Sequence, residues 1–348
     1  MKTLIKNARI NKGYKTRELA QMLSIDQALV SKFESGARKP TREQIKQLAQ
    51  FLDIPLEEIL PLWIKEKILY EIQDEEFASQ ALTLVQEEIA KYDSAEQFLI
   101  SSTLQEKLDL IDSLKSKLDK LREFDSYRIA QALELEYTFE SNRIEGNTLT
   151  LKETDLVINE GLTVSGKSMR EHLEAINHQE AIEYVKDLVQ RKVSINEREL
   201  LVIHNMILRG IMPEYAGKYR NIQVMIKGSA HMPPQPFLVP KKMEEYFEWY
   251  QINRNKLHPV VLAAEMHERL VTIHPFVDGN GRTSRLIMNL ILLKHGFVIA
   301  NIKGDYDARM NYYNALELVQ TEKEKDTFLN FIADVEIDCL NRYLKILS

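Results

Sequence analysis

The chain has 348 residues and a formal net charge of −6, with 44% hydrophobic and 28% charged residues. This length predicts two or three domains with packed cores, and no apolar run approaches the ~18 residues that a membrane span needs. The single cysteine, Cys339, excludes an intrachain disulfide and fits a reducing, cytoplasmic setting, in which its apolar context predicts a buried thiol. The polar N-terminal residues are not typical of a signal peptide.

The charge is divided unevenly along the chain. Residues 1–60 carry eleven Lys or Arg against seven Asp or Glu, a local charge of +4, so the remainder carries −10. Basic surfaces attract nucleic acid, whereas acidic ones repel it. We therefore expect only the N-terminal segment to contact nucleic acid.

Residues 1–60 predict five short helices. Thr16 begins the second helix, Asp26 caps the third, and Gly36 ends it. Thr41 and Gln44 have the spacing of a capping box that opens the fourth helix. The pattern is typical of a small helical DNA-binding domain.

The same segment resembles the lambda-repressor-like helix-turn-helix family in Glu18-Leu-Ala20, Val30-Ser-Lys-Phe33, Glu34-Ser-Gly36 and Arg38-Lys-Pro40. The resemblance implies that the third helix reads duplex DNA from its N-terminal end. A glutamine there can read adenine in the major groove, and nearby cations suit phosphates. A two-fold symmetric DNA site would require a homodimer. The predicted DNA-binding residues are Asp26, Gln27, Ala28, Lys32, Arg38 and Lys39.

Residues 61–124 predict a charge-rich helical connector, in which the leucines between Leu104 and Leu121 are near heptad spacing but span too few heptads for a coiled coil. Residues 125–348 predict a second, predominantly helical domain. One stretch departs from that pattern, because Ile222, Val224 and Ile226 alternate strictly within 218–228. The expected fold is mainly α, with a short β-hairpin at this stretch.

The segment His274-Pro-Phe-Val-Asp-Gly-Asn-Gly-Arg-Thr-Ser-Arg285 concentrates groups that suit phosphate chemistry. One helix should end at His274, and an apolar helix should begin after the tight turn of residues 278–281. The turn then presents free backbone N–H groups at a helix N-terminus, which is an anion site. Gly279 and Gly281 let the backbone approach a phosphate closely.

Three side chains complete this predicted phosphate site. Arg282 and Arg285 share one helix face, and guanidinium groups bind phosphate oxygens in pairs. Asp278 supplies the single carboxylate that Mg²⁺ commonly takes from a protein when phosphates complete its shell. His274 can accept a proton near neutral pH.

The segment also resembles the signature of the Fic family of adenylyltransferases, His-x-Phe-x-(Asp/Glu)-Gly-Asn-Gly-Arg-x-x-Arg, with similarity extending over roughly residues 125–320. The resemblance implies that His274 deprotonates a target hydroxyl that attacks the α-phosphate of ATP, while Asp278 holds Mg²⁺. It further implies that Asn280 and Arg282 hold the α- and β-phosphates and Arg285 the γ-phosphate. Phe276 should pack the motif into the core, and Tyr312 or Tyr313 either wall the adenine or belong to the core. The predicted target-docking flap is Gln223, Val224, Met225, Ile226, Lys227 and Gly228.

A second motif bears on regulation. Ser141-Asn-Arg-Ile-Glu145-Gly146 matches the family's inhibitory pattern, (Ser/Thr)-x-x-x-Glu-(Gly/Asn). By that resemblance, Glu145 pairs with Arg285 and takes the place of the γ-phosphate, on an inhibitory helix near 138–147 that Gly146 ends. His178, His204 and His231 have no metal-ligand spacing and are interpreted as ordinary.

The sequence thus predicts a self-inhibited protein adenylyltransferase that moves AMP from ATP to a Ser, Thr or Tyr hydroxyl of a protein, including its own, coupled to a DNA-binding domain. Two alternatives stay open. One is a transcriptional regulator whose Fic domain only senses nucleotide, although sensing needs no base at His274. The other is a changed chemistry, either transfer of another nucleotide or removal of AMP with Glu145 positioning water.

Overall fold

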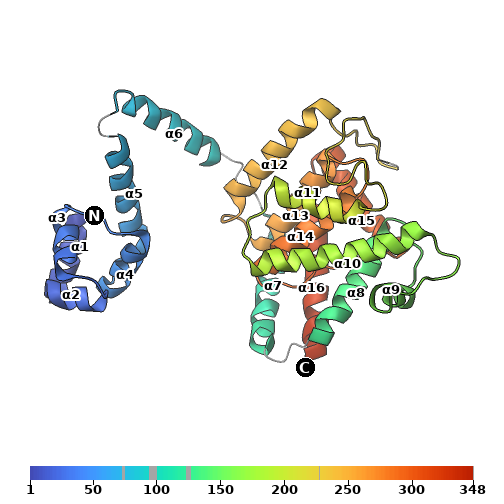
Figure 1. Ribbon diagram of the computed structural model, residues 1–348, viewed down its shortest axis with the longest axis horizontal. Helices are drawn as coiled ribbons and strands as arrows, with labels where there is room; N and C mark the ends of the chain where they lie inside the picture. Colours follow the sequence, from blue (N-terminus) through green and yellow to red (C-terminus); the bar gives the residue numbers. More distant parts are fainter. Residues whose placement is uncertain (73–74, 94–99, 123–126, 227, 348) are drawn as a thin grey trace. The chain divides into compact units, whose positions relative to one another are not determined.

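A computed structural model describes residues 1–348 except 73–74, 94–99, 123–126, 227 and 348. The chain divides into two compact units, Met1–Gln97 and Phe98–Ser348 (Figure 1). Within the described ranges, every helix is too short or too polar to cross a lipid bilayer.

The first unit contains the five predicted helices. Asp26 caps the third helix by accepting a hydrogen bond from the Ala28 backbone N–H, Gly36 ends it with φ 82°, and Thr41 and Gln44 form the expected capping box at the fourth. Leu19, Val30 and other apolar side chains fill a small core between the helices. The helices of this unit are α1 (Lys2–Asn11), α2 (Thr16–Met22), α3 (Gln27–Ser35), α4 (Arg42–Leu52), α5 (Leu56–Ile72) and α6 (Ala78–Asp93).

The second unit is built around two closely packed helices, α13 and α14, which most of its other helices contact (Figure 1). Most of α13 and α14 is buried, as expected for helices that are apolar on several faces. The helices of this unit are α7 (Ser102–Leu121), α8 (Tyr127–Ile144), α9 (Leu151–Asn159), α10 (Met169–Gln190), α11 (Glu197–Leu208), η2 (Pro236–Leu238), α12 (Val239–Asn253), α13 (Pro259–Ile273), α14 (Asn280–Lys294), α15 (Tyr306–Glu322) and α16 (Asp326–Leu347).

The division between the units differs from the predicted connector of residues 61–124. Leu104, Leu108 and Leu118 of α7 are buried in the core of the second unit, where α7 packs along α16. The leucine spacing that suggested a heptad repeat is the apolar face of this one packed helix. The second unit therefore begins before residue 125.

The predicted β-hairpin at 218–228 is wrong for the described residues. This stretch runs as an irregular segment between α11 and α12 without strand pairing. Of the alternating side chains, Ile222 is exposed and Val224 and Ile226 are only half-buried, so together they cover no buried core face. An isolated two-stranded hairpin without such packing is marginal in water. Lys227, which the sequence placed in the flap, lies outside the described residues.

Candidate active site

His274 lies at the junction where α13 ends. Its backbone is left-handed, with φ 51° and ψ 57°, and its N–H donates to the Leu270 carbonyl oxygen at 2.9 Å. The His274 Nδ1 atom lies 3.3 Å from the Val271 carbonyl oxygen, which favours the tautomer whose Nε2 is a free acceptor. Burial lowers the pKa of His274 to about 4, so the imidazole is neutral and able to act as a base at pH 7.

The loop after His274 is closed by Asn280. The Asn280 side chain accepts a hydrogen bond from the Phe276 N–H at 3.0 Å and donates to the Phe276 carbonyl at 2.9 Å. Phe276 is fully buried, as predicted. The amide predicted to hold phosphate is therefore engaged in shaping the turn.

His204 on α11 supports the same loop, although its sequence context led to its interpretation as an ordinary residue. Its ring stacks on Phe276 with centroids 3.6 Å apart, and its Nε2 lies 2.9 Å from the Asp278 carbonyl oxygen. Its Nδ1 accepts a hydrogen bond from the Gly217 N–H at 3.0 Å. Burial lowers the pKa of His204 to about 4, so a neutral ring can both accept and donate in this way. His204 is thus a positioning residue.

Glu145 and Arg285 form the ion pair that the inhibitory motif predicts. The Glu145 Oε1 atom lies 2.7 Å from Arg285 Nη2, and α8 ends at the preceding Ile144. Only 1% of the Arg285 side chain is exposed, against 32% for Glu145. A Cβ atom at Gly281 would lie 2.4 Å from that Glu145 oxygen. The carboxylate therefore occupies the space against the first turn of α14, where the sequence predicted an anion.

Ser141 fixes the other side of the Arg285 guanidinium. Arg285 donates from Nε to the Ser141 hydroxyl at 3.0 Å and from Nη2 to the Ser141 carbonyl at 2.9 Å. The hydroxyl also lies 2.9 Å from His178 Nε2, so a second histidine without ligand spacing belongs to the site's support. Burial, with the nearby arginines, lowers the pKa of His178 well below its usual value. Ser141, Glu145 and Arg285 thus form one polar cluster, in which Ser141 and Arg285 are buried and Glu145 reaches the surface.

Asp278 is engaged by two arginines. Its Oδ2 accepts from Arg170 Nη2 at 2.7 Å, and its Oδ1 accepts from the Gly279 N–H at 2.6 Å and lies 3.5 Å from Arg282 Nη2. Burial opposes ionisation of Asp278, but Arg282, the Gly279 N–H and Arg170 outweigh it and lower the pKa of the carboxyl group. Glu174 lies 3.4 Å from Arg282 Nη1 and also pairs with Arg170. Arg170 and Glu174 have no place in the family signature, and sequence reasoning missed them.

A cavity of about 470 Å³ is lined by Glu145, His274, Asp278 and Arg285 together. Tyr312 is nearly fully buried and its hydroxyl lies 2.9 Å from His267 Nε2, whereas Tyr313 is 40% exposed. The predicted flap contributes Met225, Ile226 and Gly228 to the lining, but not Gln223 or Val224. The lining residues are Ile144, Glu145, Met225, Ile226, Gly228, Ser229, Val271, His274, Asp278, Gly281, Arg285, Tyr312, Tyr313, Leu316, Glu317 and Gln320.

The segment after α11 is fastened at several points to the end of α13. Arg220 donates to the His274 carbonyl at 2.8 Å and to the Pro234 carbonyl at 2.5 Å. His231 Nε2 lies 2.8 Å from the Thr272 carbonyl oxygen, which gives the third of the histidines interpreted as ordinary a role in holding this segment. These bonds hold the irregular segment beside the cavity without strand pairing.

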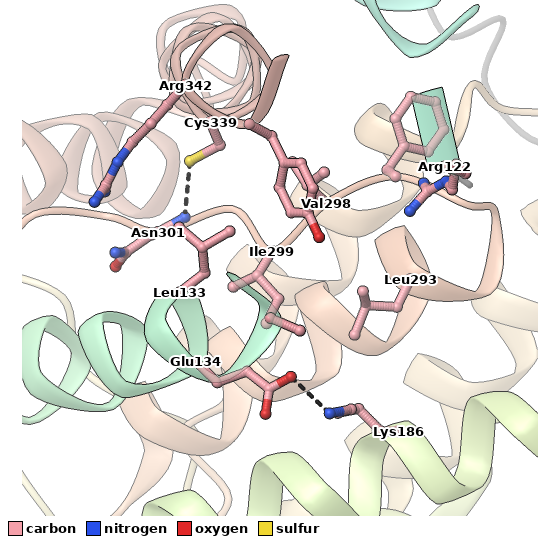
Figure 2. A pocket seen from close by; sticks show the side chains of 13 residues that line it. Arg122, Leu133, Glu134, Lys186, Leu293, Val298, Ile299, Asn301, Cys339 and Arg342 are labelled. Atoms are coloured by element: carbon pink, nitrogen blue, oxygen red, sulfur yellow. Dashed lines mark hydrogen bonds and ion pairs between the residues drawn. The ribbon is translucent and has the colours of Figure 1, made fainter. Parts of the chain in front are cut away.

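A second cavity, of about 210 Å³, lies between α8, α16 and residues 297–301 (Figure 2). Its charged groups are paired, as Figure 2 shows for Glu134 and Lys186 at 2.6 Å. The Asn301 N–H donates to Cys339 Sγ at 3.3 Å, and burial raises the pKa of the thiol to about 12. This cavity thus has a largely apolar lining and a thiol that stays protonated at neutral pH, so the first cavity is the better candidate for catalysis.

The residues predicted to bind DNA lie at the exposed N-terminal end of α3 and after it. Asp26, Gln27 and Ala28 are exposed, and Gln27 Nε2 donates to the Thr16 hydroxyl of α2 at 3.1 Å. Lys32 and Arg38 are also exposed. Lys39 differs, because its Nζ donates to the Glu66 carbonyl at 2.6 Å and lies 4.3 Å from the centre of the Tyr70 ring.

Comparison with known families supports both units. A model of the Fic/DOC family matches residues 194–292, and a helix-turn-helix model matches residues 5–59. Curated relatives include the protein adenylyltransferase Fic of Nematostella vectensis, 36% identical over 69% of this chain and 56% of its own length. The corresponding Drosophila mojavensis protein is 36% identical over 70% of this chain and 47% of its own length. The chain thus spans about half the length of these relatives.

Solved structures show the same architecture. A Fic-domain-containing signaling protein from Bacteroides thetaiotaomicron superposes with a TM-score of 0.62 at 27% identity, covering 68% of this chain and 97% of that one. A Fic family protein from Desulfovibrio desulfuricans gives a TM-score of 0.63 at 26% identity, covering 72% of this chain and 76% of that one. The chain therefore carries a helix-turn-helix domain followed by a domain of the Fic family.

Proposed function

We propose that this chain is a self-inhibited protein adenylyltransferase, which moves AMP from ATP to a hydroxyl side chain of a protein. The observation that carries the proposal is the Glu145–Arg285 pair against Gly281, in one cavity with His274. This cavity thereby combines a base, an arginine that can bind phosphate, and a carboxylate in the position where a phosphate would bind. The adenylyltransferase names of the curated relatives support the same reaction.

The site's polar atoms fit a triphosphate. Within the described residues, Arg282 Nε and Arg285 Nη1 are buried without a hydrogen-bond partner, so phosphate oxygens would satisfy donors that the protein leaves open. Backbone N–H groups at the start of α14 and the space beside Gly281, which the Glu145 carboxylate occupies here, suit the same anion.

The donor set also fits Mg²⁺ with nucleotide rather than a metal alone. Groups of three or more His, Cys, Asp or Glu in metal-binding positions are absent from the described part of the chain. Asp278 is the carboxylate that would hold Mg²⁺, with phosphate oxygens and water completing the shell. When bound, Mg²⁺ would neutralise phosphate charge.

The reaction follows from the placement of His274. Its Nε2 takes the proton of the target hydroxyl, whose oxygen forms a bond to the α-phosphorus of ATP. The bond between the α-phosphorus and its bridging oxygen breaks, and pyrophosphate leaves. In the resting state Glu145 is paired with Arg285. The triphosphate is therefore excluded, or it binds with its α-phosphate out of line with the target hydroxyl. An error near 1 Å in such a reaction can cost about 10²-fold in rate.

Transfer of α-labelled AMP tests this function. Full-length wild type and Glu145→Gly are incubated with labelled ATP, Mg²⁺ and cell lysate, and the labelled proteins are identified by mass spectrometry. We expect Glu145→Gly to label itself or a lysate protein on the order of 10²-fold faster than wild type. Adding Arg285→Ala should remove that gain, because relief acts through Arg285.

Parallel reactions separate the alternatives. Labelling from GTP or UTP but not ATP would show a different nucleotide, and loss of AMP from a modified target would show the reverse reaction. Tight nucleotide binding without transfer in the Glu145→Gly variant would instead support a regulator that only senses nucleotide.

Residues 1–60 supply the second part of the proposal, recognition of duplex DNA by α3. The exposed side chains of Gln27, Lys32 and Arg38 support it. Lys39 supports it less, since its ammonium group is bound within the unit. A two-fold symmetric DNA site would be bound by a homodimer of the chain.

A further inference from the structure

Arg170 is held between two carboxylates at the edge of the active site. It donates from Nη2 to Asp278 Oδ2 at 2.7 Å and from Nε to Glu174 Oε1 at 3.1 Å. Its side chain is 53% exposed, whereas that of Glu174 is 9% exposed. The guanidinium group therefore reaches from solvent onto buried or half-buried anions.

The position of Arg170 in its helix is unfavourable without these anions. Arg170 is the second residue of α10, where the helix presents the positive end of its dipole. A cation there is repelled, and an acidic residue is preferred, as the neighbouring Glu171 illustrates. The contacts with Asp278 and Glu174 account for an arginine at this place.

The contact blocks the carboxylate that the proposed function assigns to Mg²⁺. Asp278 Oδ2 accepts from Arg170, while Oδ1 accepts from the Gly279 N–H and faces Arg282. A divalent cation needs at least one of these oxygens, and Oδ2 is the one whose partner is an exposed, movable side chain. Arg170 therefore competes with a metal for Asp278.

We propose that Arg170 is a second inhibitory element, which occupies the place of the cation as Glu145 occupies the place of the γ-phosphate. The proposal rests on the proposed function for the assignment of Mg²⁺ to Asp278. In the resting site, Arg170 neutralises Asp278 and Glu145 neutralises Arg285. Mg²⁺ and ATP together replace both partners. Glu174, four residues along the helix, keeps hold of the displaced arginine.

The test measures how strongly Mg²⁺ promotes nucleotide binding, without any turnover. The Kd of a fluorescent, non-hydrolysable ATP analogue is measured on the full-length protein in EDTA and in Mg²⁺. The Kd in EDTA divided by the Kd in Mg²⁺ is the metal coupling ratio. Arg170→Ala and Arg170→Gln should raise that ratio by roughly two- to fivefold, the range expected for loss of one partly exposed ion pair. An unchanged or smaller ratio would overturn the proposal.

Arg191→Ala is the matched control. Arg191 follows directly after α10 as its C-cap residue, pairs with a carboxylate four residues away, Asp187 at 2.9 Å, and is similarly exposed. Its removal should leave the ratio unchanged. Equal weakening of nucleotide binding by Arg170→Ala in EDTA and in Mg²⁺ would identify Arg170 as a phosphate ligand instead and would also overturn the proposal.

Asp278→Ala separates failure of this proposal from failure of the metal assignment. If Asp278 holds the metal, the ratio in this variant falls toward one. A ratio that falls in Asp278→Ala but does not rise in Arg170→Ala rejects only the role of Arg170. A ratio unaffected by Asp278→Ala rejects both the metal site of the proposed function and the inference drawn from it.

Discussion

The two units of this chain place their polar groups in opposite ways. Among the described residues of Met1–Gln97, every side chain in the buried class is apolar, and the candidate DNA-binding groups lie on the surface. In Phe98–Ser348, by contrast, Ser141, Arg282 and Arg285 are nearly fully buried at the candidate active site. In the first unit, function and stability can therefore be changed separately, whereas in the second the same residues determine both.

His274→Ala should give the largest single effect. Loss of a general base typically costs about 10²–10⁴-fold in rate, and the imidazole is not among the phosphate-binding groups, so nucleotide affinity should be nearly unchanged. The measurement is AMP transfer and nucleotide Kd in the Glu145→Gly background. Transfer within a few-fold of the parent would show that another group takes the proton.

Acidification should distinguish the two units next. All eight histidines lie in the second unit, and burial lowers the pKa of His204 and His274 to about 4 and that of His267 to about 3. Unfolded histidines titrate near 6.5, so the unfolded chain binds more protons between pH 4 and 6.5. The stability of the second unit should be fully present above pH 6.5 and fall steadily as the pH drops toward 4.

The two tryptophans allow this acid effect to be assigned within the full chain. Trp63 lies in the first unit, where its Nε1 donates to the Pro40 carbonyl at 2.9 Å, and Trp249 lies in the second, under Arg269. Fluorescence melts of Trp63→Phe and Trp249→Phe follow one unit each. A midpoint that drops equally for both probes between pH 7 and pH 5 would contradict the assignment to the buried histidines.

Glu145→Gly should lower the stability of the nucleotide-free second unit by about 1–3 kcal/mol. The change removes a charged hydrogen bond from Arg285, which stays buried but keeps its two bonds to Ser141. Because Glu145 is partly exposed, the loss should be smaller than for a fully buried pair. A non-hydrolysable ATP analogue should restore part of it in a thermal melt. Equal melting of variant and wild type without nucleotide would contradict a stabilising pair.

Gln27→Ala should have the smallest effect on folding and a clear effect on DNA. Gln27 is exposed, so stability should change by less than about 0.5 kcal/mol. Discrimination between preferred and random duplexes, selected from a random-sequence library with the full chain, should fall about tenfold. Lys32→Ala should weaken all duplexes alike and reduce the salt dependence. Equal binding of wild type to every duplex would argue against specific recognition by α3.

Local signals in the sequence predicted the elements that depend on local rules. The caps at Asp26, Gly36 and Thr41 and the helix end at His274 are confirmed because neighbouring backbone groups determine them. The hairpin at 218–228 failed because alternation without a buried face does not make strands. The assignment of α7 to a connector was wrong because the spacing of its leucines does not show which helix packs against them.

The sequence motifs predicted one contact of the candidate site and missed the residues that support its loop. Glu145 and Arg285 are 140 residues apart in the sequence and form the expected ion pair. His204, Arg170 and Glu174 come from α11 and α10, and only tertiary packing brings them to the loop. A single signal was available for Arg170, since a cation in the first turn of a helix requires an explanation.

The left-handed backbone of His274 has a consequence for the variants that this position tolerates. A residue with a side chain pays roughly 1–2 kcal/mol in this conformation, whereas glycine adopts it freely. His274→Gly should therefore melt no lower than His274→Ala, although both remove the imidazole. The turn therefore does not require a histidine, and the side chain is explained by its place in the lining of the cavity.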